Sequence, residues 1–358
     1  MKKVNRQIYI NARFLLARPT GVERYAYEMC RALYSEGADI VLLCPKRGEI
    51  NEAYDISGFR IVRFGICHSH LWEQLVLPFY FIGKRNYVLL SFTGLGSILV
   101  PKKIMTIHDL SFLENPSWFS KAYYHYYRIM TPLAAKTSEK IITVSKFSKN
   151  EIMRFYPFLS EEKIEVVYNA VDREKFHPDC FHPGEKRTSP AEPYFLAVSS
   201  IDPRKNFNRL IEAFQGLPNC QLKIVGGKNH VFGKESSGSH SYSNIEFLGR
   251  VTDEELKVLY SNAIAFIFPS LYEGFGLPPI EAMASDTVVL ASDIPVLREV
   301  CGNSAIFFNP TDITAIRNAI TSALYLTTEE RKEILLCGNK NLERFSWRLS
   351  AKNLLANL

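Results

Sequence analysis

The feature that most constrains the fold is a regular alternation of short β-branched runs with helical patterns along the chain of 358 residues. At 22–36, apolar residues recur at i, i+3, i+4, i+7, i+8 and i+11, and Gly37 follows, which predicts a helix that ends there. Alternating strands and helices are typical of α/β folds with parallel sheets covered on both faces. The strands expected in the first half lie at 7–10, 40–44, 56–64, 87–91, 103–108, 140–145 and 164–168.

A break in this alternation divides the chain into two domains. The segment 178–193 (PDCFHPGEKRTSPAEP) is rich in proline and poor in apolar residues, which predicts a linker. We therefore expect domains at 1–177 and 194–345, each of a size that buries its own core. The stretch 228–243, rich in Gly, Ser and His, predicts a surface loop, and Thr252 with Glu255 forms a capping box that opens a helix. The second-half strands are expected at 194–199, 221–225, 245–248, 265–269, 287–291 and 305–308.

Composition and motifs exclude several classes of protein. With 47% hydrophobic and 22% charged residues the chain is typical of globular proteins, and no uncharged apolar run reaches the roughly 18–20 residues of a membrane span. The N-terminus lacks the features of an export signal, and seven cysteines without a Cys-x-x-Cys pair predict reduced thiols in a cytoplasmic protein. No His-x-x-x-His or Asp-x-Asp sequence occurs, so we expect neither a metal site nor a cofactor.

Charge is divided unevenly between the two halves. The net formal charge is +6, and basic residues exceed acidic ones by eight in residues 1–190 but fall two short of them in the rest. This asymmetry fits an anionic acceptor or an anionic membrane surface beside the first domain, and fits equally a domain kept in solution by Lys and Arg. No nucleic-acid partner is expected.

The most distinctive motif is SLYEGFGLPPIE at 270–281, between an expected buried strand and an expected helix. Open α/β sheets bind ligands at the carboxyl ends of their strands, near helix N-termini. Backbone amides from Gly274 to Leu277 would suit phosphate or sugar oxygens, and Glu273 and Glu281 would accept hydrogen bonds from hydroxyl pairs. A Gly-x-Gly turn by itself often only connects two elements.

Two adjacent cations, Arg204 and Lys205, follow the first expected strand of the second half and open an expected helix. They would complement a diphosphate and stabilise the negative charge that develops as it leaves. Cations at a helix N-terminus oppose the helix dipole, which favours an anion partner over a merely solvated pair. In the first half, Gly21 opens a helix and His108 ends a strand, where each could face a ligand or serve only the structure.

These residues resemble the family 4 retaining glycosyltransferases of the GT-B fold, and the resemblance runs over nearly the whole chain. The shared motifs are TGVERY at 20–25, IHD at 107–109, ITVSKFS at 142–148, VVYNAVD at 166–172, PRKN at 203–206, FLGRV at 247–251 and the Glu273-x7-Glu281 block. The family implies two Rossmann-like domains that face each other across a cleft. It also implies that a final helix, about 346–358, crosses back to the first domain.

The resemblance implies a role for each matched residue. Glu273 would contact donor-sugar hydroxyls, Glu281 the ribose, and Arg204 with Lys205 the diphosphate. Arg250 and Val251 would lie near the nucleobase. Further donor contacts would come from Gly21 of the first domain and from Gly274, Phe275, Gly276 and Leu277. His108 would complete the catalytic site. Many relatives have Gly-Ile-Gly where this chain has Gly21-Val22-Glu23, which puts the backbone contact at the second glycine in doubt.

The function implied is metal-independent transfer of a hexose, with retention, from a nucleotide sugar to a growing bacterial surface glycan on a lipid carrier at the inner membrane face. GDP-mannose is the favoured donor, with UDP- and dTDP-sugars as alternatives. A non-catalytic sugar-binding protein and a nicotinamide-dependent oxidoreductase are competing hypotheses, but Gly94-Leu-Gly-Ser lacks the third glycine of a dinucleotide site. The sequence leaves open the donor, the acceptor and its linkage, and the oligomeric state.

Overall fold

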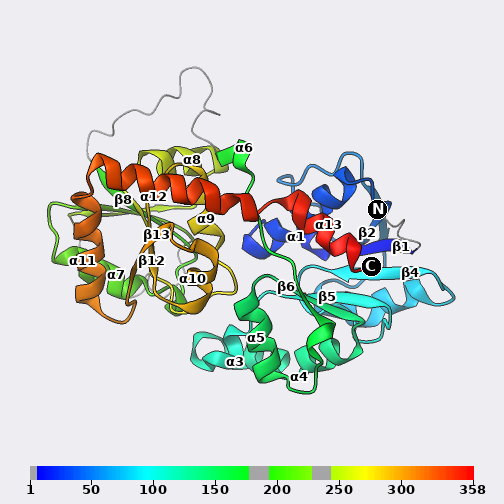
Figure 1. Ribbon diagram of the computed structural model, residues 1–358. Coiled ribbons are helices and arrows are strands. Elements are labelled where there is room, and N and C mark those ends of the chain that lie inside the picture. Colours follow the sequence, from blue (N-terminus) through cyan, green and yellow to red (C-terminus); the bar gives the residue numbers. More distant parts are fainter. Residues whose placement is uncertain (1–5, 177–192, 228–242) are drawn as a thin grey trace. The chain divides into compact units, whose positions relative to one another are not determined.

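The structure is a computed structural model that describes residues 6–176, 193–227 and 243–358 and divides into two units (Figure 1). Unit 1 comprises Met1–Asn169 and Ser346–Leu358, and unit 2 comprises Ala170–Phe345. The expected linker and the expected loop at 228–243 lie outside the described residues, apart from Pro193 and Ser243. 

Unit 2 begins earlier than the sequence boundary at 177, because the short helix α6 (Arg173–Phe176) packs within it. The Phe176 ring lies 6.2 Å from that of Tyr260, and Lys175 pairs with Asp253.

Unit 1 contains a seven-stranded parallel sheet with the order β3-β2-β1-β4-β5-β6-β7. Its strands are β1 (Gln7–Asn11), β2 (Ile40–Pro45), β3 (Arg60–Phe64), β4 (Tyr87–Ser91), β5 (Lys103–Ile107), β6 (Lys140–Thr143) and β7 (Ile164–Val166). Its helices are α1 (Gly21–Ser35), α2 (Ser69–Leu71), α3 (Ser111–Glu114), α4 (Lys121–Thr137), α5 (Lys146–Phe155) and α13 (Trp347–Ala356). Short 3-10 turns lie at Arg13–Leu16, Leu77–Phe81, Pro116–Trp118 and Glu161–Lys163, and a π-helical turn at Trp72–Val76.

Unit 2 contains a six-stranded parallel sheet with the order β10-β9-β8-β11-β12-β13. Its strands are β8 (Tyr194–Val198), β9 (Gln221–Val225), β10 (Ile245–Gly249), β11 (Phe266–Phe268), β12 (Val289–Ser292) and β13 (Ala305–Phe308). Its longer helices are α7 (Phe207–Gln215), α8 (Asp253–Asn262), α9 (Leu277–Ala284), α10 (Pro295–Cys301), α11 (Ile313–Leu324) and α12 (Thr328–Asn341). The predicted α/β class with two parallel, Rossmann-like sheets is confirmed.

Strands buried on both faces explain why the sequence signal was clear. Every residue of β2 and β4 is buried, and such continuous apolar runs are what a parallel strand covered by helices on both sides requires. In unit 2 the rings of Phe195 and Phe214 meet edge to face at 5.7 Å in the main core cluster. These contacts join the sheet to α7.

One predicted strand is too long. The sequence predicted a strand at 56–64, but β3 begins only at Arg60. The Asp55 carboxylate accepts hydrogen bonds from the amide and hydroxyl of Ser57, and Gly58 has φ +83°, so the preceding residues form a turn. The capping box of Thr252 and Glu255 forms as predicted at the start of α8.

The last helix, α13, packs within unit 1 beside α1 (Figure 1). The ring of Trp347 lies 5.8 Å from that of Tyr25, and Arg348 Nε donates to Glu36 at 2.7 Å. The Ser350 hydroxyl donates to the carbonyl of Tyr168 at 2.7 Å, near the point where the chain leaves unit 1. None of the described helices combines the length and apolar character needed to cross a bilayer.

We predict that α13 stabilises unit 1 through its buried face. Leu354 is fully buried whereas Leu349, on the same helix, is 45% exposed. Leu354→Ala should lower the free energy of unfolding by about 2–5 kcal/mol through lost transfer energy and a cavity. The matched Leu349→Ala should change it by no more than about 0.5 kcal/mol. Urea unfolding followed by circular dichroism measures both, and equal losses would contradict the packing of α13.

Candidate functional site

Each sheet has a position where its strand order reverses, between β1 and β4 in unit 1 and between β8 and β11 in unit 2. At such a switch point the loops after the two strands diverge, and ligands of open α/β sheets bind there, outside the carboxyl ends. Arg204 and Lys205 follow β8, and Glu273 follows β11. His108 follows β5, the neighbour of β4. Arg204, Lys205 and Glu273 therefore lie at the switch point of unit 2, and His108 lies one strand from that of unit 1.

In unit 2, the loops after β8 and β11 are joined by a buried ion pair. Lys205 Nζ donates to Glu273 Oε1 at 2.6 Å, and these residues are only 8% and 6% exposed. Arg204 Nη1 donates to Glu273 Oε2 and to the carbonyl of Tyr272, both at 3.3 Å. The Asp202 carboxylate also lies 3.9 Å from Arg204 Nε, so two cations face two carboxylates here.

The cationic pair does not open a helix, which corrects the sequence prediction. Arg204 and Lys205 lie in a 3-10 turn (Pro203–Lys205), and Asn206 follows in the left-handed conformation with φ 59° before α7 begins. The side-chain amide of Asn206 donates to the carbonyls of Pro269 at 3.1 Å and Pro310 at 2.7 Å, which holds that conformation in place. Repulsion by the helix dipole is therefore not the reason to expect an anion partner. Glu273 balances part of the charge instead.

The glycine loop before α9 offers amide donors, but fewer than a helix N-terminus normally would. Gly276 is the N-cap of α9 with φ +98°, and a Cβ there would lie 2.9 Å from Leu297 Cδ2, so a glycine is required. The next residues are Leu277 and two prolines, which have no N–H to donate. Among the described residues, no acceptor receives a hydrogen bond from the amide of Gly276 or Leu277. Ligand contacts to backbone amides are therefore limited to the residues that precede Pro278.

Glu281 lies on α9 and is 8% exposed. The hydroxyl of the fully buried Tyr260, on α8, donates to Glu281 Oε2 at 3.2 Å. A buried tyrosine that orients this carboxylate is a partner that the sequence motif did not reveal. Arg250 follows β10 and packs over Gly227, whose Cβ would lie 3.0 Å from Arg250 Nε, while Val251 is half-buried beside it.

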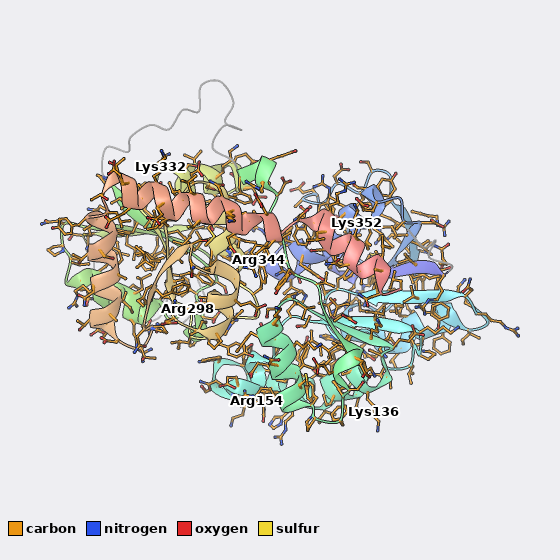
Figure 2. All side chains as sticks on the ribbon, viewed as in Figure 1. Lys136, Arg154, Arg298, Lys332, Arg344 and Lys352 are labelled. Atoms are coloured by element: carbon orange, nitrogen blue, oxygen red, sulfur yellow. The ribbon has the colours of Figure 1, made fainter. Side chains whose placement is uncertain are left out.

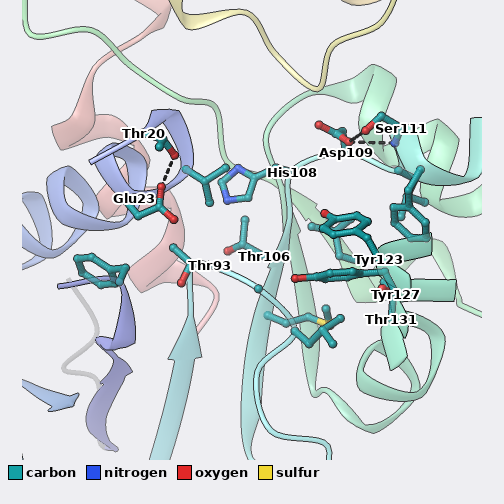
Figure 3. Close-up of a pocket in the computed structure, with 18 of the residues that line it drawn as sticks. Thr20, Glu23, Thr93, Thr106, His108, Asp109, Ser111, Tyr123, Tyr127 and Thr131 are labelled. Atoms are coloured by element: carbon teal, nitrogen blue, oxygen red, sulfur yellow. Dashed lines mark hydrogen bonds between the residues drawn. The ribbon is translucent and has the colours of Figure 1, made fainter. Parts of the chain in front are cut away.

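In unit 1 the switch point opens into a cavity of about 370 Å³ (Figure 3). Residues from the ends of β1, β4 and β5 line one side, including Arg13, Thr93 and His108. Tyr123 and Tyr127, on α4, line the opposite side. Of these residues, only His108 was predicted from the sequence as a site residue. Arg13 could have been found by its place just after the first strand, whereas the tyrosines carried no signal beyond an ordinary helix pattern.

The His108 ring is neutral, with one nitrogen that donates a hydrogen bond and one that can accept one. Its Nε2 lies 2.8 Å from the carbonyl oxygen of Phe92 and must donate, because a carbonyl only accepts. Burial lowers the pKa of His108 from its ordinary value of 6.5, against the opposing effects of that hydrogen bond and of Asp109 and Glu23. The ring stands edge to face on Tyr25 at 4.9 Å. Nδ1 therefore keeps a lone pair and can accept a hydrogen bond from a ligand hydroxyl.

Gly21 is the first residue of α1, and an added Cβ would meet no other atom within 4 Å. Its neighbour Thr20 donates its hydroxyl to the Glu23 carboxylate instead of capping the helix amides (Figure 3). A carboxylate thus lies beside the amides that an anion would otherwise use. The predicted backbone contact at Gly21 stays a prediction.

Metal independence also stays a prediction. In the parts of the chain that the structure describes, no group of three or more His, Cys, Asp or Glu side chains could hold a metal ion. The polar groups of the site are cationic side chains, backbone amides and carboxylates that can accept hydrogen bonds from hydroxyl groups.

Comparisons with known proteins bear on both units. A sequence model described as Glycosyltransferase Family 4 matches residues 19–175, and one described as Glycosyl transferases group 1 matches residues 182–335. Over 226 residues the chain is 34% identical to the "O-antigen chain mannosyltransferase RfbU" of Salmonella typhimurium. That alignment covers 62% of this chain and 61% of the Salmonella protein, so the chain matches less than two thirds of its relative's length.

Solved structures share the fold over almost the whole chain. The sucrose-phosphate synthase of Thermosynechococcus elongatus superposes with a TM-score of 0.78 at 20% identity, covering 98% of this chain and 97% of that one. The Anabaena protein Alr3699/HepE in complex with UDP and glucose gives 0.77 at 16% identity, covering 98% and 99%. Identities this low establish the fold alone.

We predict that His108 makes the stability of the protein depend on pH. A folded-state pKa below 6.5 means that the unfolded chain binds the extra proton first, so stability is complete above pH 6.5 and falls as pH drops towards the folded pKa. The slope should reach about 1.4 kcal/mol per pH unit. His108→Gln should lose this slope, and His125→Gln, at an exposed position on α4, should keep it.

Urea unfolding between pH 5 and 7.5 measures the slopes, and NMR titration of the imidazole signals reports the pKa directly. A His108 ring that titrates at or above 6.5 would contradict the buried, neutral assignment.

Proposed function

We propose, from the premise that this chain belongs to the family 4 glycosyltransferases of the GT-B fold, that it transfers a hexose from a nucleoside diphosphate sugar to a bacterial surface glycan. The single observation that carries this proposal is the cluster of Arg204, Lys205 and Glu273 at the switch point of unit 2. Two cations and the amides of Gly276 and Leu277 fit a diphosphate, and carboxylate oxygens fit sugar hydroxyls.

Each residue of the cluster has a part in the proposed reaction. The cations of Arg204 and Lys205 stabilise the charge that builds on the leaving diphosphate, where preorganised donors contribute most. A carboxylate has about four lone-pair sites, so Glu273 can hold both cations and still accept from donor-sugar hydroxyls. Glu281, oriented by Tyr260, accepts from the ribose hydroxyls.

The proposed transfer retains the anomeric configuration. The bond between the sugar C1 and the diphosphate oxygen breaks, a bond forms from C1 to the acceptor oxygen, and the acceptor proton passes to the departing phosphate on the same face. Glu273 is a poor covalent nucleophile, because both of its oxygens already accept hydrogen bonds from cations. This supports a route assisted by the leaving group.

For the donor we propose GDP-mannose. The support for mannose is the 34% identity to the Salmonella protein, which is an O-antigen chain mannosyltransferase. UDP- and dTDP-sugars are the alternatives. A screen of nucleotide sugars for diphosphate release, with lipid-linked glycans as acceptors, decides between them. Release from none of the donors, with or without acceptor, would end the proposal.

For the acceptor we propose a glycan on a lipid carrier, reached by docking on an anionic membrane. The helix α4 has no acidic residue, and Lys121, Arg128 and Lys136 are exposed on it (Figure 2 labels Lys136). Ile129 on the same face is 61% exposed, and Leu133 is 46% exposed. Basic and apolar side chains together bind anionic bilayers, at about 1 kcal/mol per cation near the surface.

A groove continues this surface. A hollow of about 510 Å³ beside α4 is lined by residues that include Pro132, Leu133, Phe158 and Lys163. Phe158 is 54% exposed, and Lys163 Nζ donates to the carbonyl of Lys136 at 2.9 Å. An acyl chain or headgroup at this groove would meet apolar walls and two ammonium groups.

We predict that the cluster in unit 2 is required for transfer. Glu273→Ala and Lys205→Ala should each lower kcat by about a hundredfold or more, because each removes a group that stabilises charge in the transition state. Lys223→Ala, which breaks an ion pair with Glu246 on the same sheet, is the matched control and should keep full activity. Rates are measured by diphosphate release, with circular dichroism to verify folding. Full activity in a folded Glu273→Ala protein would remove the proposed role.

We predict that vesicle binding depends on α4. Wild-type protein should co-sediment with vesicles containing phosphatidylglycerol more than with pure phosphatidylcholine, and less as salt increases. The double variant Arg128→Glu/Lys136→Glu should lose about tenfold or more in binding, by the estimate per cation given above. The matched control is Lys332→Glu, at an exposed position on α12 of unit 2 (Figure 2). Equal loss in the control would show that only net charge matters.

A further inference from the structure

The cavity of unit 1 contains a guanidinium whose hydrogen-bonding capacity is largely unused. Arg13 lines the cavity, and among the described residues its guanidinium makes one hydrogen bond, a long one of 3.4 Å from Nη1 to the Ser69 hydroxyl. Its Nε is buried without an acceptor, and Arg13 pairs with no carboxylate among the described residues. A guanidinium has five N–H donors, and buried donors without partners are rare in folded proteins. An acceptor for Arg13 is therefore expected from a ligand.

A fully buried carboxyl group lies behind the wall of this cavity. Asn11, the last residue of β1, donates to Glu73 Oε1 at 2.6 Å, while Oε2 is buried without a hydrogen-bond donor and lies 3.6 Å from His70 Nδ1. Gly94 separates the two charged groups. A Cβ there would lie 3.1 Å from Arg13 Nη2 and 3.9 Å from both Glu73 oxygens. Glu73 therefore offsets the charge of Arg13 without occupying its donors.

The opposite side of the cavity is aromatic. The rings of Tyr123 and Tyr127 lie 4.3 Å apart, and that of Phe112 lies 6.0 Å from Tyr127 (Figure 3). Arg13 and these two tyrosines line the same cavity, so the guanidinium and the aromatic side belong to one site. Aromatic walls with a few convergent polar groups are typical of small-molecule sites, and a pyranose ring presents a C–H face to such a wall.

The charge of the cavity is unfavourable for an anion. Its lining holds one cation, Arg13, and two carboxylates, Glu23 and Asp109, while His108 is neutral. Glu73 adds a further acidic group behind the wall. A phosphate or carboxylate on a ligand would meet like charges at low dielectric, whereas hydroxyl groups would find both donors and acceptors. The overall basic charge of the first half of the chain is therefore not the charge of this cavity.

We propose that the unit 1 cavity is the acceptor subsite and selects an uncharged pyranose, with Arg13 donating to its hydroxyls and Tyr123 and Tyr127 lying against its ring face. The inference rests on the proposed transferase function and specifies the chemical class of the sugar that receives the hexose. The membrane charge acts on α4, outside this cavity, so an anionic carrier and a neutral acceptor sugar are compatible.

The test compares acceptors that differ only in charge. Wild-type protein, with the donor identified by screening, is given octyl α-mannopyranoside, its 6-phosphate and the corresponding uronate. The expected kcat/KM is about tenfold or more higher for the neutral glycoside, because an anion meets the acidic groups of the cavity. Glu23→Gln/Asp109→Asn should narrow this ratio. Equal or better use of either anionic acceptor by the wild type overturns the inference.

Variants of Arg13 test its role. Arg13→Gln should raise KM for the neutral acceptor about tenfold or more while KM for the donor stays within about twofold, as expected for loss of a hydrogen bond from a charged group. Arg13→Lys should recover only part of the loss, because a single ammonium does not reproduce the guanidinium fork. Arg31→Gln, exposed on α1, is the matched control. A rise in both KM values together, or none, overturns the assignment of Arg13.

Failure of this inference is distinguishable from failure of the proposed function. Release of nucleoside diphosphate in the absence of acceptor reports only on donor cleavage. If no donor is ever cleaved, the proposed function fails and takes this inference with it. If donors are cleaved and sugar is transferred equally to charged and neutral acceptors, the function stands and only the neutral subsite is wrong.

Discussion

The buried ion pair between Lys205 and Glu273 is the interaction on which the candidate donor site depends. It joins the loops that follow β8 and β11, which diverge at the switch point of the unit 2 sheet. Neither charge would be tolerated there alone, because an unpaired buried ion costs several kcal/mol. The pair therefore sets the position of both loops. Asn206 reinforces this arrangement by donating to the carbonyls of Pro269, after β11, and Pro310, after β13. Positioning and charge reside in the same residues.

The two units apply one topology to different chemistry. In both, the strand order reverses beside the first strand, and polar residues collect where the loops diverge. Unit 2 fills this place with Arg204 and Lys205, two adjacent cations whose N–H donors suit an anion. Unit 1 has a cavity with more acidic than basic groups, a neutral His108 and an aromatic side, which suits hydroxyl groups. Side chains at the strand ends, rather than the fold, make this distinction.

Much of the fold was predictable because parallel strands covered on both faces need continuous apolar runs. Every expected strand forms, and β4 has the predicted bounds. The error at 56–64 arose where Ile56 and Gly58 continued an apolar pattern that Asp55 and Ser57 turned into a loop by local hydrogen bonds. The helix expected at Arg204 failed for a different reason, since Asn206 is held by carbonyls from distant parts of the chain.

The α/β class, the order of strands along the chain, the glycine loop and the cations and carboxylates at the strand ends follow from local patterns and short motifs. The pairing of these side chains follows from the folded structure. It brought Glu273 onto Lys205 and Tyr260 onto Glu281, and it left Arg13 Nε without an acceptor in the unit that also buries Glu73. Contacts between residues some 20 to 70 positions apart depend on how strands are ordered in a sheet. Local sequence patterns do not specify that order.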